Sequence, residues 1–150
     1  AGFTLPTCNI SSLHQRLLDM ARRKLDGLDL RPQITIDAEM PLSSLSGKTI
    51  RMLNALSPYG YGNPSPTFLT RGVNVIECRS VGGRGEHLRL RLQDGEVRWH
   101  GIGFRLGQFI EEVRAELDIV YNIEVDEWAG GEMLELNILD FQPSASQGGA

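Results

Sequence analysis

The sequence contains few cysteines and histidines and no long hydrophobic run, so it offers little for a metal centre, a disulfide or a membrane span. Its 150 residues include two cysteines, Cys8 and Cys78, without a CxxC spacing or a histidine cluster beside them. Two free thiols in a reducing compartment are therefore the simplest interpretation. The three histidines, His14, His87 and His100, form neither an HxxxH nor an HxE motif. No apolar run approaches the roughly 18–20 residues that cross a bilayer, and the first residues lack the basic start and apolar stretch of a secretory signal.

A recognisable catalytic set is also missing. No GxSxG motif and no plausible Cys–His pair occurs, and Asp37 with Glu39, two residues apart, is a weak signal for cation binding. The glycine-rich segment 82–85 lacks Walker or dinucleotide spacing and no helix follows it, so we expect a hairpin-type turn rather than a phosphate cradle. On its own the chain is not expected to be an enzyme. Because it begins without methionine, we expect it to be part of a longer protein.

Charge is distributed unevenly along the chain. The net charge is −4, but residues 1–70 carry +2, residues 71–110 carry +3 and residues 111–150 carry −9. Seven arginines give the middle segment its positive charge. A basic region of this kind can attract nucleic acid even when the whole chain is acidic.

Residues 57–66 (Ser-Pro-Tyr-Gly-Tyr-Gly-Asn-Pro-Ser-Pro) are the most distinctive segment, called the connector below. Three prolines, two glycines and an asparagine in ten positions cannot continue a helix or enter a central strand. The two tyrosines argue against a plain flexible linker, so we expect a rigid segment that joins a helical first third to a β-rich remainder. Its characteristic residues are Pro58, Tyr59, Gly60, Gly62, Asn63 and Pro64.

The periodicity of apolar residues predicts a mainly β protein with helices (α+β), in which five or six short strands form a small closed or partly open barrel preceded by a helical segment. Helices are expected over 11–26, about 47–56 and roughly 105–114, the last of which interrupts the strands. Strands are expected over 33–37, 67–70, 73–81, 86–92, 96–102, 117–125 and 133–140, with a hairpin turn over 126–131. A domain boundary is expected near the connector, although residues 33–56 could pack onto the barrel.

The strand His-Leu-Arg-Leu-Arg-Leu over 87–92 has the clearest two-sided pattern. Its leucines alternate with His87, Arg89 and Arg91, so the leucines are expected in the core and the three polar residues outside. Side chains about 7 Å apart along a strand roughly match the phosphates of an extended nucleic acid strand. The alternative is a solvated outer face with cross-strand ion pairs.

Trp99 has two possible roles as well. If Ile102 and Phe104 share the inward face of their strand, Trp99 points outward beside the arginines, where an indole can stack on an unpaired base. Partly buried packing is the alternative for this tryptophan. The same choice applies to three other aromatic residues, Tyr59, Tyr61 and Trp128.

Several segments together resemble the C-terminal part of RecJ-type single-strand-specific DNA exonucleases. They are the opening Ala-Gly-Phe-Thr, Ile-Thr-Ile-Asp-Ala-Glu at 34–39, the connector extended to Thr-Phe at 67–68, His-Leu-Arg-Leu at 87–90, Ile-Gly-Phe at 102–104, Glu-Trp-Ala-Gly at 127–130 and Leu-Glu-Leu at 134–136. The family's connector usually reads Pro-Phe-Gly-x-Gly-Asn-Pro-x-Pro, so Tyr59 stands in place of a phenylalanine. The resemblance covers about residues 1–142, and the connector is fairly specific.

The resemblance implies domains, a parent enzyme and partners. Residues 1–32 would be the C-terminal tail of a DHHA1-type catalytic domain, residues 33–142 an OB-fold domain with an OB-fold-like five-stranded barrel, and residues 143–150 a disordered tail. The parent would be a bacterial, cytoplasmic 5′–3′ exonuclease of DNA repair and recombination whose catalytic domains bind Mn²⁺ or Mg²⁺, while this chain would hold no metal or cofactor. The expected partners are single-stranded DNA, the catalytic domains of the same polypeptide, and single-strand-binding or repair proteins, with no membrane.

The residues expected to bind DNA follow from the basic segment and the OB fold together. We expect contacts to the DNA backbone from six residues and stacking by Trp99; the six are Arg79, Arg84, His87, Arg89, Arg91 and Arg105. The family turn commonly reads Asn-Glu-Trp-Asn-Gly, whereas Asp126 and Ala129 stand here, which puts contacts from that turn in doubt. A protein-interaction or scaffold module of a DNA repair assembly is the alternative function, with the acidic C-terminal third docking a basic protein.

Overall fold

The computed structural model describes residues 2–126 and 133–145, and the chain divides into two compact units, Ala1–Ile34 and Thr35–Ala150. The first unit contains the 3₁₀ helix η1 (Thr7–Asn9) and the helix α1 (Ile10–Leu25). The predicted helix over 11–26 is confirmed within one residue at each end. Most of its apolar side chains, among them Leu17, Met20 and Leu25, are exposed within this unit, and α1 contains no buried residue.

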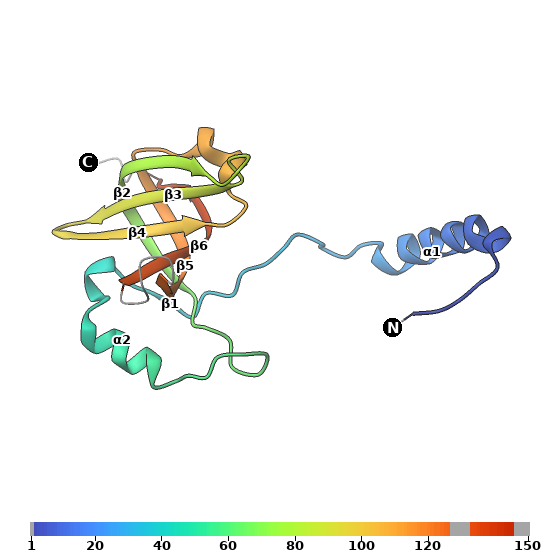
Figure 1. Cartoon of the computed structure of the whole chain (residues 1–150), viewed down its shortest axis with the longest axis horizontal. Helices are drawn as coiled ribbons and strands as arrows, with labels where there is room; N and C mark the ends of the chain where they lie inside the picture. Colours follow the sequence, from blue (N-terminus) through green and yellow to red (C-terminus); the bar gives the residue numbers. More distant parts are fainter. Residues whose placement is uncertain (1, 127–132, 146–150) are drawn as a thin grey trace. The chain divides into compact units, whose positions relative to one another are not determined.

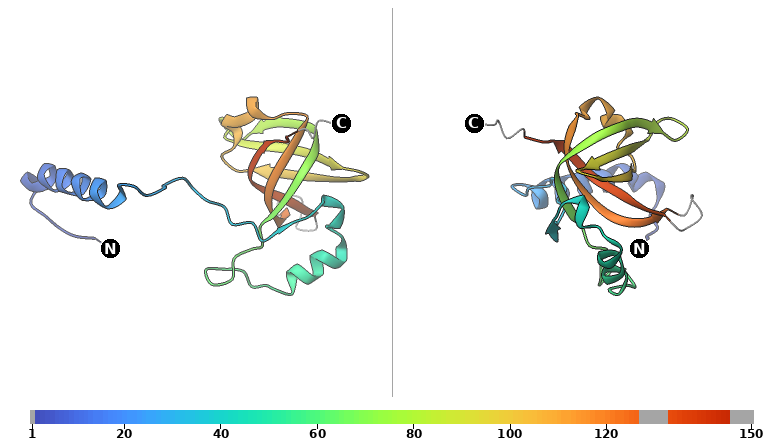
Figure 2. Two further views of the ribbon diagram at one scale, coloured as in Figure 1. Left: turned by 180° about the vertical axis from the view of Figure 1, so that it is seen from behind. Right: turned by 90° about the vertical axis from the view of Figure 1, so that its left-hand side faces the viewer.

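The second unit is a closed barrel of five strands (Figures 1 and 2). The strands pair in the order β2-β3-β4-β6-β5, and a further β2–β5 pairing closes the barrel. All these pairs are antiparallel except β4–β6, which is parallel. This is the strand arrangement of the OB fold, so the predicted fold class is confirmed. The strands are β2 (Phe68–Val81), β3 (His87–Asp94), β4 (Val97–Gly103), β5 (Glu116–Asp126) and β6 (Met133–Pro143).

The barrel interior is filled by alternate residues of its strands, as the period-two patterns predict. Leu88, Leu90 and Leu92 of β3 are at most 1% exposed. They pack with apolar residues from the other strands in one cluster, which includes Val73, Leu117, Ile119, Tyr121, Leu136 and Ile138. Burying a side chain of this size contributes about 1.5–3 kcal/mol, so the leucine side of β3 fixes which way its arginines point.

Three elements differ from the sequence prediction. The segments 67–70 and 73–81 form one strand, β2, with an irregularity between Thr70 and Val73 where Gly72 has φ 65°. Residues 33–37 form no strand because this segment first hydrogen-bonds to a neighbouring strand segment at Asp37, whose amide donates to the Thr67 carbonyl. The strand β1 follows at Ala38–Glu39 and is parallel to β2.

The predicted helix over 105–114 is the six-residue 3₁₀ helix η3 (Gly107–Glu112). Arg105 has φ 64°, and the Gly107 amide donates to the Glu86 carbonyl rather than within a helix. An α-helix therefore cannot begin where the apolar pattern begins.

The connector links the helix α2 (Gly47–Asn54) to β2 and is held by its own hydrogen bonds. The Asn63 side chain donates to the carbonyls of Leu56 and Pro58, at 2.7 and 3.1 Å, and the Tyr59 hydroxyl donates to the Leu53 carbonyl. Gly60 and Asn63 form an isolated bridge, and Tyr61 between them is fully exposed. α2 itself is preceded by the 3₁₀ helix η2 (Leu42–Ser44) and begins after Ser46, whose side chain accepts from the Thr49 amide.

At the C-terminal end, Pro143 ends β6 and the Ser144 amide donates to the Glu116 carbonyl at 3.1 Å. Residues 146–150 of the expected tail lie outside the described residues. So do residues 127–132, and with them most of the predicted turn over 126–131, including Trp128 and Ala129.

Candidate nucleic-acid interface

The outward side chains of β2, β3 and β4 form a surface rich in arginine, called the basic face below. Register places Arg79 opposite Arg89, Glu77 opposite Arg91, Arg91 opposite His100, and Gln93 opposite Arg98. All of these point away from the leucine core because they alternate with it. Six residues define the basic face: Glu77, Arg79, Arg89, Arg91, Arg98 and His100. A shallow hollow of ≈ 130 Å³ lies on it, lined by five of these residues and Leu90.

The basic face contains both ion pairs and, among the described residues, an excess of arginine over carboxylate. Glu77 lies 3.4 Å from Arg91 and 3.9 Å from Arg79, and Arg89 lies 3.2 Å from Glu135 of β6. The alternative interpretation of the arginine strand, cross-strand ion pairs, therefore describes part of this surface. Four arginines still outnumber Glu77 and Glu135, and Arg79 lies directly opposite Arg89.

Trp99 does not lie on the basic face, so the predicted stacking position is wrong. It pairs with Leu92 and packs against the core. The inward positions further along β4 are Gly101 and Gly103, where the side chains of Ile138 and Leu106 fill the space that a Cβ would need. Ile102, assumed to point inward, lies opposite Arg89 and is outward.

Because the alternation of inward and outward side chains along β4 differs by one residue from the prediction, Arg98 and His100 point outward. Neither was predicted as a site residue. The signal that could have identified them is the pair of glycines in Gly-Ile-Gly. Small residues at alternate positions of a strand mark a close approach of neighbouring groups inside a barrel. If these two glycines are taken as inward positions, the alternation along β4 places Trp99 inward and both Arg98 and His100 outward, as the structure does.

His87 continues the row of Arg89 and Arg91 along β3, whereas Arg84 and Arg105 lie beyond this row, near its His87 end. Arg84 is in the loop 82–86, and the Arg105 amide donates to His87 Nδ1 at 3.1 Å. Arg84 and Arg105 line a second hollow of ≈ 630 Å³. The structure thus divides the predicted contact residues between two neighbouring places, the basic face and this hollow.

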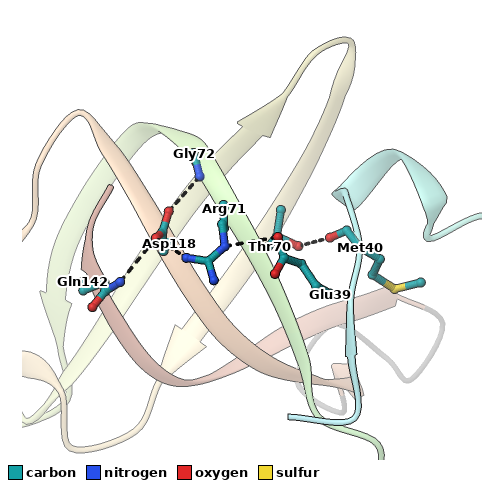
Figure 3. Close-up of polar contacts among 7 residues, drawn as sticks. All are labelled: Glu39, Met40, Thr70, Arg71, Gly72, Asp118 and Gln142. Atoms are coloured by element: carbon teal, nitrogen blue, oxygen red, sulfur yellow. Dashed lines mark hydrogen bonds and ion pairs between the residues drawn. The ribbon is translucent and has the colours of Figure 1, made fainter. Parts of the chain in front are cut away.

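A polar network on β2, β5 and β6 has a structural role (Figure 3). Asp118 is 5% exposed and accepts from the Gly72 amide at 3.0 Å and from Gln142 at 3.3 Å, and Arg71 lies 3.2 Å away. Burial acts to raise the pKa of Asp118, but the hydrogen bonds from Ser144, Gly72 and Gln142 and the charge of Arg71 outweigh it, so the pKa lies below its ordinary value. This carboxylate holds the irregular part of β2 against β5 and β6.

Other reactive groups give little sign of chemistry. Burial raises the pKa of the half-buried Cys78 thiol, which favours the less reactive protonated form. Among the described residues, no group of three or more His, Cys, Asp or Glu side chains could hold a metal ion. Within the same residues, no helix is long and apolar enough to span a membrane.

The strand order and its closure define a five-stranded OB-fold barrel. The family profile of the RecJ OB domain matches residues 36–140, and the chain belongs to this family. The chain is 25% identical over 142 residues to the single-stranded-DNA-specific exonuclease RecJ of Bacillus subtilis, and 29% identical over 150 residues to that of Thermus thermophilus.

Solved structures agree with this assignment. A crystal structure of Thermus thermophilus RecJ in complex with Mn²⁺ matches 99% of the chain with a TM-score of 0.70 and 26% identity. The same protein in complex with Mg²⁺ matches 94% with a TM-score of 0.69 and 25% identity. The chain spans only 18% and 21% of the length of the two curated relatives.

Proposed function

We propose that this chain is the single-stranded DNA-binding module of a RecJ-like 5′–3′ exonuclease and has no catalytic activity of its own. The observation that carries the proposal is the excess of arginine on the outward face of β3 and β4. In OB folds, the face of the second and third barrel strands binds oligonucleotides and oligosaccharides, and β3 and β4 occupy these places here.

Arginine–phosphate contacts would supply most of the affinity. The guanidinium group binds phosphate through two parallel hydrogen bonds, and neutralising phosphates releases counterions without reading the sequence. Because Trp99 is turned into the core, no stacking by this residue is included. The module would therefore bind strands of different sequence with similar affinity and with a strong dependence on salt.

The rest of the parent protein would perform the reaction. Residues 1–32 would complete a DHHA1-type catalytic domain, which would cover the apolar side of α1 that is exposed within its own unit. Mn²⁺ or Mg²⁺ would be held by the catalytic domains, where a metal-activated water hydrolyses the phosphodiester bond. We place the parent in the bacterial cytoplasm, in DNA repair and recombination.

Fluorescence anisotropy of a labelled single-stranded oligonucleotide at several salt concentrations tests this proposal. The double variant Arg89→Ala/Arg91→Ala is expected to weaken binding by about tenfold and to reduce the slope of log K against log salt by about 1.4, or roughly 0.7 for each phosphate that is no longer neutralised. Lys48→Ala/Arg51→Ala on α2 removes the same charge from another element and serves as the control. Equal affinity of the wild type and the Arg89/Arg91 variant would contradict a role for the basic face.

A protein-interaction module is the second candidate, supported by a hollow on another part of the barrel. This hollow of ≈ 270 Å³ is lined by four apolar residues and four polar ones, namely Ile36, Leu69, Val120 and Phe141 with Arg71, Asp118, Asp140 and Gln142. Because Asp118 is paired with Arg71, Asp140 supplies the negative charge that would attract a basic group. Such a surface suits a basic partner protein, including a single-strand-binding or repair protein. A pull-down from nuclease-treated extract distinguishes the two functions, since retention of such a protein without DNA favours the second candidate.

A further inference from the structure

At one end of the barrel, the loop 82–86 and the segment 104–107 pack backbone against backbone. The Gly107 amide donates to the Glu86 carbonyl at 3.0 Å. A Cβ on Gly107 would overlap the Gly85 carbonyl oxygen and come within 2.8 Å of the Glu86 carbonyl carbon. The contact thus requires glycine at position 107, and it fixes the loop and the segment relative to each other.

His87 also contacts the segment 104–107. Among the residues that the structure describes, Arg105 is the one non-glycine residue with a positive φ, 64°. Its amide donates to His87 Nδ1 at 3.1 Å, and the Phe104 ring meets the His87 ring edge-on with centroids 5.3 Å apart. A left-handed conformation is unfavourable in a residue other than glycine and persists where its surroundings impose it. His87 is part of those surroundings.

The hollow between these segments presents two guanidinium groups. Its volume is ≈ 630 Å³, and it is lined by Ser80, Arg84, Gly85, Glu86, Arg105, Gly107 and Gln108. No carboxylate among the described residues lies within ion-pair distance of Arg84 or Arg105.

Glu86 brings a negative charge into the same hollow. Its carboxylate accepts from the Arg84 backbone amide at 3.1 Å. This hydrogen bond, together with one from its own amide, holds the pKa of Glu86 below its ordinary value. The carboxylate is therefore engaged in shaping the loop 82–86.

We infer that this hollow binds a phosphate group of the DNA strand beyond the arginines of β3, and that His87 is a positioning residue that sets the Arg105 backbone for this contact. The inference rests on the proposed function of the basic face. Arg91, Arg89 and His87 follow each other at about 7 Å along one side of β3, so a strand that follows Arg91 and Arg89 past His87 arrives at the hollow. Two guanidinium groups and the Gln108 amide are donors suited to phosphate oxygens.

Oligonucleotide length tests the hollow separately from the basic face. Arg84→Ala/Arg105→Asn removes both guanidinium groups, and asparagine tolerates the left-handed backbone at position 105. We expect this variant to bind a ~12-nucleotide strand about tenfold more weakly than the wild type, and a ~4-nucleotide strand less than threefold more weakly, because only the longer one reaches both places.

The outcomes separate the two proposals. If this variant binds both lengths as tightly as the wild type while Arg89→Ala/Arg91→Ala binds more weakly, phosphate binding in the hollow is refuted and the proposed function is retained. Failure of the wild type to bind either oligonucleotide at low salt would overturn both.

Two substitutions at His87 test its positioning role. In His87→Asn the side-chain oxygen can take the place of Nδ1 as acceptor, whereas His87→Leu has no acceptor. We expect the asparagine variant to retain most of the affinity for the longer strand and the leucine variant to lose severalfold. In the Arg105→Asn background, His87→Leu should cause no further loss, and circular dichroism checks that each variant is folded. An equal loss from His87→Leu with and without Arg105 would show that His87 contacts the DNA itself and would overturn the positioning role.

Discussion

Replacing Gly107 by alanine gives a strong test of the packing between loop 82–86 and segment 104–107. The added methyl group would overlap the Gly85 carbonyl oxygen and lie 2.9 Å from the Gly85 carbonyl carbon. These are backbone atoms, so the two segments must separate. Overpacking of this kind costs about 1–3 kcal/mol, and loss of the Gly107–Glu86 hydrogen bond adds about 1 kcal/mol. We therefore expect the free energy of unfolding to fall by about 3 kcal/mol.

Urea denaturation and calorimetry measure this change. At about 4 °C per kcal/mol for a domain of this size, the melting temperature should fall by about 12 °C. Gly83→Ala is a matched control in the same loop, because a Cβ there meets nothing within 4 Å, and its free energy of unfolding should stay within about 0.5 kcal/mol of the wild type. A Gly107→Ala protein as stable as the Gly83→Ala protein would refute the close packing.

Two further predictions concern the barrel. The pKa of Asp118 is lowered in the folded state, so its carboxylate stabilises the fold at pH values above the ordinary carboxyl pKa of about 4. This contribution is lost as the pH falls from that value through the lower pKa of the folded state. Asp118→Asn should thus be less stable than the wild type by about 2 kcal/mol at pH 7, with a smaller difference at pH 3 in urea titrations; a difference that grows in acid would contradict the network. Trp99→Phe should leave the affinity for single-stranded DNA within about twofold, whereas Trp99→Ala should lower the free energy of unfolding by about 2 kcal/mol. If the Trp99→Phe variant bound single-stranded DNA tenfold more weakly in the anisotropy assay, Trp99 would instead stack on a base.

The sequence alone predicts the strands whose two sides differ strongly. Alternation of leucine with arginine on β3 is unambiguous, and it correctly predicts both the core side and the outward arginines. On β4 the alternation is weak because glycines take two inward positions. If Ile102 is assumed to point inward, each side chain of β4 is assigned to the opposite side of the strand, and Trp99 is placed on the outer face.

Features that depend on contacts distant in the sequence could not be predicted. The 3₁₀ helix η3 replaces an α-helix because Gly107 pairs with Glu86, and the strand expected at 33–37 has no partner until Asp37. The pairing of Arg79 with Arg89 and the contact of His87 with the Arg105 amide likewise arise from register and turn geometry. Local patterns contain no information on these contacts.

The closed strand order has a consequence for how the protein behaves in concentrated solution. Each of the five barrel strands has a hydrogen-bonded neighbour on both sides, and β2 serves as the partner of both β3 and β5. A strand with an unpaired edge is a template for association with other chains. Truncation before β6 would leave β4 and β5 each without one neighbour, so a shortened chain should aggregate where the whole barrel stays monodisperse.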